Sequence, residues 1–229
     1  MRVAQVPGVV PPLVMFVQAI LPGKELVRDI YFHLTYSKNL GWKHALVRSP
    51  EDLKKYSIVK KNLSFLTVTK NPYSWLLSLH RRPYHQYYSK KPDFERFLQT
   101  PWKTVGRDNV TKKILNSPVE LWNLKNASYI RLPNELPALN ITSESILADP
   151  ERIIHLISSK LSIARLSENF VDYERSTKDK TRDTNYYRDY YLNERWKENL
   201  STEAISIIND GIDKKLMMHF GYKFLAGHN

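Results

Sequence analysis

Two kinds of apolar pattern alternate along the chain. Residues 13–21 and 63–69 are compact runs rich in branched and aromatic side chains, the pattern of a buried strand. Elsewhere apolar side chains recur every three or four residues, as on a helix that packs one face against a core. The clearest stripes are Ile153, Ile154, Ile157 and Leu161, and, on one long last helix, Ile205, Ile208, Ile212 and Leu216. The alternation predicts an α/β fold, a three-layer arrangement in which helices flank a parallel β-sheet.

Capping and turn residues set the expected boundaries. Pro22-Gly23-Lys24 predicts a turn from the first strand into a helix over 25–34. Asn71 and Pro72 fit the N-cap and the first helical position, where a missing N–H costs nothing, so a helix should follow the second strand. The other expected elements are helices starting near 49, near 94, at 118 behind a Ser117/Glu120 capping box and at 150, short strands on either side of 133–137, and an exposed loop or lid over 81–91.

Composition narrows the partners of such a domain. At 229 residues the chain fits a single domain, 1–229, with a full core. The 35 Lys and Arg against 23 Asp and Glu give a formal net charge of +12, which favours anionic partners such as nucleotides, sulfated or uronic glycans, or nucleic acid. The chain has no cysteine, so a disulfide framework, a thiol nucleophile and a cysteine-based metal site are excluded.

Targeting signals favour the cytoplasm. The apolar run 13–21 is nine residues long, too short to cross a bilayer, so we expect no membrane span. Pro7, Pro11 and Pro12 argue against a signal peptide. Five Asn-x-Ser/Thr sequons could suggest secretion, but Asn62 abuts an expected buried strand and such matches arise by chance. We therefore expect a soluble cytoplasmic protein.

The junction between the second strand and its helix carries the main candidate chemistry. The first-turn amides of a helix carry the positive end of its dipole and can bind a phosphate or a sulfate. Lys70 adds a full charge there, and helical spacing puts Asn71, Ser74 and Ser78 on one polar stripe. The apolar face opposite is expected to be Trp75, Leu76 and Leu79. One anionic group could touch both Lys70 and Ser78; the alternative is an ordinary strand–helix joint with a solvated lysine.

This junction resembles the 3′-phosphate-binding segment of the sulfotransferase family. The likeness lies in a basic residue that ends a strand, an Asn-Pro pair, an aromatic-rich turn and a serine eight positions after the basic residue. In that family the two residues hold the 3′-phosphate of the sulfuryl donor PAPS (3′-phosphoadenosine 5′-phosphosulfate). The resemblance implies this role for Lys70 and Ser78, a P-loop-NTPase-like fold, and PAPS or its product PAP as the nucleotide. The family usually has arginine where Lys70 stands, so the charge is kept and the bidentate fork is lost.

Later segments extend the resemblance over most of the chain. They are similar, in the same order, to segments of bacterial- and phage-type members: a helix and strand, an acidic segment, and a closing aromatic pattern. In this sequence they are Ser117–Asn123 with Tyr129–Leu132, then Ser143–Glu151, then Tyr190–Tyr222.

The resemblance also implies a donor loop after the first strand, which in the family holds the 5′-phosphosulfate. Gly23 and Lys24 stand in that place, and Lys24 is the expected stabiliser of the leaving group. Both threonines of the family loop are missing, and Glu25 adds an anion. The alternative is a glycine turn with a solvated lysine.

A base is needed to take the proton of the acceptor. His44, in the run Gly41-Trp42-Lys43-His44, is the expected base, because an imidazole titrates near neutral pH and some family members resemble this run. His80 and His85 compete for the role. No spacing of His, Asp and Glu suggests a metal site, and the transfer needs no metal.

Three functions therefore compete. The first is a sulfotransferase that moves the sulfuryl group from PAPS to a hydroxyl or amine, such as that of a saccharide. The second is a binding protein for nucleic acid or another polyanion, supported by the charge and by the basic, aromatic segment 84–91. The third is a sulfotransferase-like fold that binds the nucleotide without transfer, suggested by the altered donor loop.

Overall fold

The computed structural model describes residues 30–31, 34, 44–55, 63–86, 88, 90–172, 174 and 181–227. Within these ranges the elements are α3 (Pro50–Lys55), β1 (Phe65–Thr69), α4 (Pro72–Arg81), α5 (Phe94–Gln99), β2 (Trp102–Lys103), η1 (Gly106–Asp108), β3 (Ile114–Leu115), α6 (Pro118–Arg131), η2 (Leu132–Asn134), β4 (Ala138–Thr142), α7 (Ser143–Ala148), α8 (Pro150–Leu161), α9 (Thr184–Leu192), η3 (Arg195–Asn199), α10 (Thr202–Gly211) and α11 (Lys214–His219).

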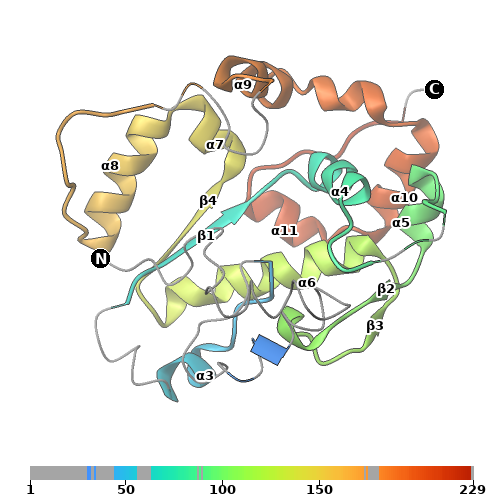
Figure 1. The fold of residues 1–229 in the computed structure, drawn as a ribbon, viewed down its shortest axis with the longest axis horizontal. Helices are drawn as coiled ribbons and strands as arrows, with labels where there is room; N and C mark the ends of the chain where they lie inside the picture. The colour runs from blue at the N-terminus through green and yellow to red at the C-terminus, as the bar shows by residue number, and fades with distance from the viewer. Residues whose placement is uncertain are drawn as a thin grey trace, which may run out of the picture.

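A parallel pair of strands, β1 and β4, runs through the middle of the molecule (Figure 1). Its register runs from Phe65 opposite Ala138 to Thr69 opposite Thr142. The other pair, β2 and β3, is antiparallel. The described structure is therefore mixed α/β and mostly helical, which confirms the predicted class in its coarse form. The three-layer sheet stays a prediction, since the expected first strand, 13–21, lies outside the described residues.

Strand β1 forms where the sequence predicts it, but it is buried on one face only. Thr67 and Thr69 point inward, and each donates its hydroxyl to an asparagine side chain. Leu66 and Val68 are 44% and 45% exposed. Successive residues of a strand face opposite ways, and here the threonine face meets the interior. The expectation of a fully buried strand is therefore wrong.

Four helices begin at the side chains that predicted them. A side-chain oxygen at each start accepts a hydrogen bond from a backbone N–H two or three residues later, which satisfies a donor that the helix leaves open. The capping residues are Ser49 for α3, Asn71 for α4, Ser117 for α6 and Asp149 for α8.

Two helical predictions need correction. Tyr129–Leu132, expected as a strand from the resemblance, belongs to α6 and the start of η2. The last long helix is two helices, because the carboxylate of Asp213 accepts from the amides of Lys215 and Leu216 and so starts α11 anew. The predicted stripe is nevertheless buried as expected, at Ile205, Ile208, Ile212 and Leu216. On α8, Ile153 and Leu161 are buried but Ile154 is 38% exposed.

The segment 81–91 is exposed only in part: Arg81, Arg82, Lys90 and Lys91 are exposed, as its polar composition predicts, but other residues of the segment are not. His85 is buried, and Tyr84 and Tyr88 pack against the main core. Aromatic side chains have large apolar surfaces, and burying these surfaces against the core is favourable.

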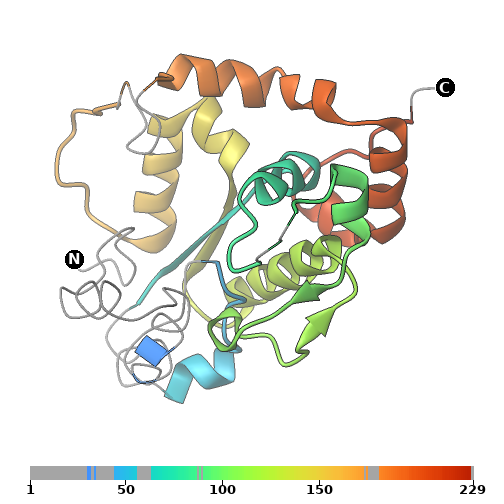
Figure 2. The same cartoon turned by 45° about the vertical axis from the view of Figure 1, so that its right-hand side comes forward.

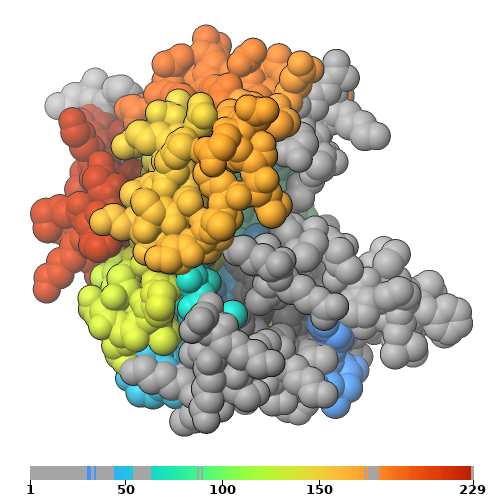
Figure 3. All heavy atoms as spheres, turned by 90° about the vertical axis from the view of Figure 1, so that its left-hand side faces the viewer, coloured from blue at the N-terminus to red at the C-terminus, as the bar shows by residue number. Residues whose placement is uncertain are grey.

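The main core lies where α4, α5, α6 and α10 meet. Its largest fully buried side chains are Tyr73, Phe97, Trp102, Trp122 and Trp196. Helix α6 runs beneath β1 and α4, and α9 crosses above them (Figures 1 and 2). Figure 3 shows the side of the molecule that lies on the left in Figure 1, where α8 and the segment after it lie below α9. Among the described residues no helix is both long and apolar enough to cross a bilayer.

Candidate anion-binding site

The turn between β1 and α4 is held from below by α6. The hydroxyl of Thr69 donates to Oδ1 of Asn126 at 2.7 Å, and the indole N–H of Trp122 donates to the carbonyl of Lys70 at 3.0 Å. Trp122 is 1% exposed, so the donor of this second bond is fully buried. The backbone of Lys70 is therefore fixed, and its side chain leaves the turn from a defined point.

The side chains of Lys70 and Ser78 lie close together, the arrangement that one anion touching both would require. Lys70 Nζ lies 2.9 Å from Ser78 Oγ, although the two residues are eight positions apart. The ammonium also donates to the hydroxyl of Tyr191 at 3.0 Å and lies 4.1 Å from the centre of that ring. An ammonium has three N–H donors, so a third remains for another acceptor. We call Lys70, Ser78 and Tyr191 the Lys70 site.

Burial weakens the hold of Lys70 on its proton. The pKa of its ammonium falls from the ordinary value to about 8, chiefly because burial removes water from the charge. The carboxylate of Glu144 counteracts this fall, and the guanidinium of Arg81 adds to it. A second cation, Arg81, thus lies within electrostatic range of the Lys70 site, and a bound anion would favour the charged form of Lys70.

The N-terminus of α4 is not the open anion site that the sequence suggested. The amide of Asn71 donates to Oε1 of Glu144 at 3.0 Å, and the amide of Tyr73 donates to Oδ1 of Asn71 at 3.1 Å. Asn71, Pro72, Tyr73 and Ser74 are all buried. The expectation of outward, unpaired amides is therefore wrong for these two groups, and the cationic surface is made by side chains instead.

Trp75 also differs from its expected place. It was expected opposite the polar stripe, but at 100° per residue it is only about 60° from Ser78 around the helix axis. Both side chains are half-buried. Trp75 and Ser78 are therefore neighbours on one face of α4.

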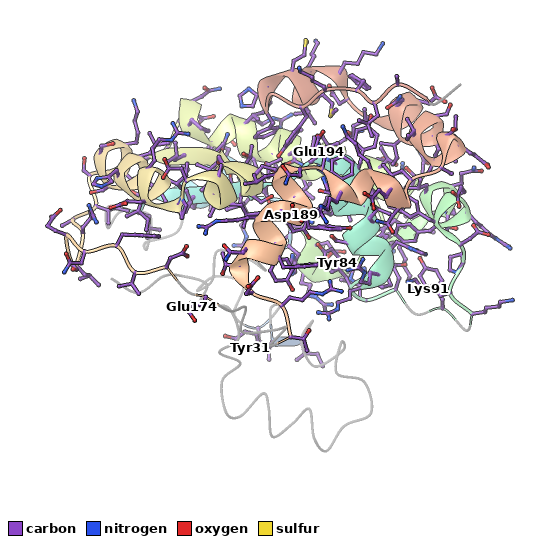
Figure 4. The ribbon with its side chains drawn as sticks, turned by 90° about the horizontal axis from the view of Figure 1, so that it is seen from above. Tyr31, Tyr84, Lys91, Glu174, Asp189 and Glu194 are labelled. Atoms are coloured by element: carbon purple, nitrogen blue, oxygen red, sulfur yellow. The ribbon has the colours of Figure 1, made fainter. Side chains whose placement is uncertain are left out.

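Sequence reasoning missed the contribution of α9. Tyr191 reaches Lys70 from a point 121 residues further along the chain, and the neighbouring Tyr190 lies within electrostatic range of Arg81. Figure 4 looks down on α9, marked by Asp189, where it lies over α4. The signals in the sequence are the density of tyrosines, four within Thr184–Leu192, and the closing aromatic pattern that begins at Tyr190.

His44, the expected base, lies against Tyr84. The two rings stack with centroids 4.6 Å apart, and Nδ1 of His44 is 3.3 Å from the hydroxyl of Tyr84. Figure 4 shows Tyr84 near the C-terminal end of α4. Burial and the carboxylate of Asp108 raise the pKa of Tyr84, so this hydroxyl keeps its proton. A neutral hydroxyl of this kind can orient the imidazole.

The two competing histidines have structural partners. Nε2 of His80 lies 2.9 Å from the carbonyl of Pro92, and Nε2 of His85 lies 2.8 Å from the carbonyl of Lys103. A carbonyl only accepts, so each Nε2 carries a proton and donates it.

The donor loop cannot be placed beside these groups. Gly23, Lys24 and Glu25, together with Lys43, lie outside the described residues. A search of the described ranges for three or more His, Asp or Glu side chains able to hold a metal finds no such group.

Comparison with protein-family models, with curated proteins and with solved structures finds no match for this chain.

Proposed function

We propose that this protein is a sulfotransferase, with PAPS as donor and a hydroxyl or an amine, such as that of a saccharide, as acceptor. The observation that carries the proposal is the 2.9 Å contact between Lys70 Nζ and Ser78 Oγ. An ammonium, a hydroxyl and the nearby guanidinium of Arg81 suit a dianionic phosphate, since charge-assisted hydrogen bonds are the strong ones. The proposal includes a cytoplasmic location for this enzyme.

In the proposed reaction the acceptor oxygen or nitrogen attacks the sulfur of the donor. The new bond forms as the bond from sulfur to the bridging oxygen breaks, and PAP leaves with that electron pair. The acceptor proton passes to His44, and Lys24 stabilises the charge on the departing phosphate. Positioning and electrostatics supply most of the catalysis in transfers of this kind.

Thermal denaturation with PAP and with 5′-AMP tests the nucleotide site. Only PAP has a 3′-phosphate, so the wild type should gain more stability from PAP than from 5′-AMP. Lys70→Met should reduce the PAP shift to that of 5′-AMP. Lys160→Met removes the same charge from an exposed position on α8 and should leave the shifts unchanged. Equal shifts for both nucleotides in the wild type would refute the proposal.

A turnover assay separates transfer from binding alone. Wild type incubated with PAPS and a panel of hydroxyl and amine acceptors should release PAP, and His44→Asn should lose this release while it keeps the PAP-induced shift in melting temperature. Binding of PAP without turnover over the whole panel would select the alternative of a nucleotide-binding protein, which the missing threonines and Glu25 favour. Strongly salt-dependent RNA binding that PAP does not compete with would select the polyanion-binding alternative.

A further inference from the structure

A second buried lysine, Lys125, lies on α6 next to the Lys70 site. Lys125 is 8% exposed. Over the ranges that the structure describes, its ammonium makes no hydrogen bond and no ion pair, and it lies over the ring of Trp75, with Nζ 5.9 Å from the ring centre. The Nζ atom keeps some contact with solvent, and a charge that has little water and no hydrogen-bonding partner in the protein is costly. The ammonium of Lys125 therefore lacks what a bound anion would supply.

The charges around Lys125 do not satisfy it. The pKa of Lys125 falls to about 8, chiefly through burial, and the carboxylate of Asp108 opposes this fall. Asp108 has other partners, since it accepts from the amide of Val105 at 2.9 Å and lies 3.4 Å from Nε2 of His85. The attraction between Asp108 and Lys125 is thus electrostatic, without a hydrogen bond between them.

The two lysines approach neighbouring side chains of one helix face. Lys70 Nζ meets Ser78, and Lys125 Nζ faces the ring of Trp75. Trp75 and Ser78 are three residues apart on α4, a spacing that puts Cβ atoms about 5–6 Å apart. A compact ligand with two anionic groups could therefore engage both ammonium groups at once.

We propose that Lys125 binds the 5′-phosphate end of the nucleotide whose 3′-phosphate is bound by Lys70 and Ser78. This inference rests on the proposed function. PAP has both phosphates on one ribose, which matches two cations on one helix face. His44 stacks on Tyr84, and the carboxylate of Asp108 acts electrostatically on both Tyr84 and Lys125.

Calorimetric titration with PAP, 3′-AMP and 5′-AMP tests this assignment. The wild type should bind PAP more tightly than 3′-AMP, because only PAP has the 5′-phosphate. Lys125→Met should weaken PAP binding by about tenfold, the size of one charged hydrogen bond, and leave 3′-AMP within about twofold. Lys70→Met should instead remove the preference for PAP over 5′-AMP. Lys160→Met is the control of equal charge change.

The outcomes separate the two proposals. If PAP and 5′-AMP bind the wild type equally, the proposed function fails. If PAP is preferred through Lys70 but Lys125→Met keeps the wild-type preference for PAP over 3′-AMP, the assignment of Lys125 is overturned and the proposed function stands.

A measurement on the wild type avoids any doubt about folding of the variant. Reductive methylation at pH 8, followed by peptide mass spectrometry, reports the access and charge of each lysine. PAP should slow methylation of Lys125 much more than 3′-AMP does. Equal protection by both nucleotides would overturn the assignment.

Discussion

Lys70 is half-buried and Lys125 is buried, and the two ammonium groups differ in their hydrogen-bonding partners. Burial lowers the pKa of each to about 8. Lys70 donates to Ser78 and Tyr191, whereas Lys125 has no hydrogen-bonding partner among the described residues. The protein itself therefore compensates part of the cost of the first charge. The charge of Lys125 has no such compensation, which points to a bound anion as its partner. The following experiments test this difference between the two lysines.

The largest expected effect is at the residue that supports both lysines. Trp122 donates to the carbonyl of Lys70 and lies one helical turn before Lys125, with 1% of its surface exposed. Trp122→Ala should lower the free energy of unfolding by about 3–5 kcal/mol through lost packing, measured by urea denaturation.

Trp122→Phe is the matched control, because it keeps most of the buried ring and loses the indole N–H. Its cost should be about 1 kcal/mol, the net value of a typical hydrogen bond. We expect it to weaken the preference of PAP over 5′-AMP, since the backbone of Lys70 is less firmly held. Equal destabilisation by Ala and Phe would contradict the packing role.

The next effect is a dependence of stability on pH. Between pH 8 and 10 the unfolded chain keeps protons on both lysines that the native state has lost, so the free energy of unfolding should rise with pH. The rise is at most about 3 kcal/mol for each lysine. Melting curves from pH 7.5 to 9.5 measure it, below the range in which Tyr73, Tyr84 and Tyr129, whose pKa values are raised, reverse the trend.

PAP affinity should change in the opposite direction over the same interval, because phosphate binds the ammonium form. Lys125→Met should remove part of the rise in stability and should melt no lower than the wild type at pH 7.5. Lys160→Met should keep the whole rise. A wild-type melting temperature that stays flat between pH 7.5 and 9.5 would show that neither ammonium loses its proton in the native state.

Local parts of the site could be predicted from the sequence. Asn71 follows Lys70 directly, and Ser78 comes two helical turns later on α4. Cap chemistry and helical spacing therefore determine where these side chains point. The same holds for the starts of α3, α6 and α8, each of which begins at a capping side chain.

The rest depends on contacts between distant segments. Tyr191 reaches Lys70 across 121 positions, and Glu144 reaches the amide of Asn71 across 73. Nothing in the local pattern of α6 marks Lys125 as buried, because a lone lysine between Leu124 and Asn126 is typical of an exposed face. The stripe 205–216 was recognised as core, yet its break at Asp213 follows from a side-chain cap that the apolar period does not show.

Ser78→Ala should have a moderate effect confined to the Lys70 site. It removes the hydroxyl that accepts from Lys70 at 2.9 Å and donates to the carbonyl of Ser74 at 2.9 Å; to bind a 3′-phosphate, this hydroxyl would turn its proton from that carbonyl to the phosphate. The preference for PAP over 5′-AMP should fall by about fivefold, which is about 1 kcal/mol. The preference for PAP over 3′-AMP should not change. Ser74→Ala is the control, since its hydroxyl donates to the carbonyl of Asn71 at 3.2 Å; an equal loss in both variants would assign the effect to the helix.

The smallest expected effect is at Glu144, the internal anion of the Lys70 site. Its carboxylate accepts from the amide of Asn71 and from the hydroxyl of Tyr222, and it raises the pKa of Lys70. Glu144→Gln removes a charge that repels phosphate and keeps an acceptor for the amide, so PAP should bind about twofold to threefold more tightly at pH 7. The same change leaves the charge of Lys70 less well compensated, so the pKa of Lys70 should fall. PAP binding by the variant should therefore weaken at a lower pH than PAP binding by the wild type does. Calorimetric titrations at pH 7 and pH 8.5 measure both effects. Weaker PAP binding at pH 7 would mean that Glu144 acts mainly by positioning the turn between β1 and α4. The difference between the two lysines would then depend on backbone geometry rather than on charge.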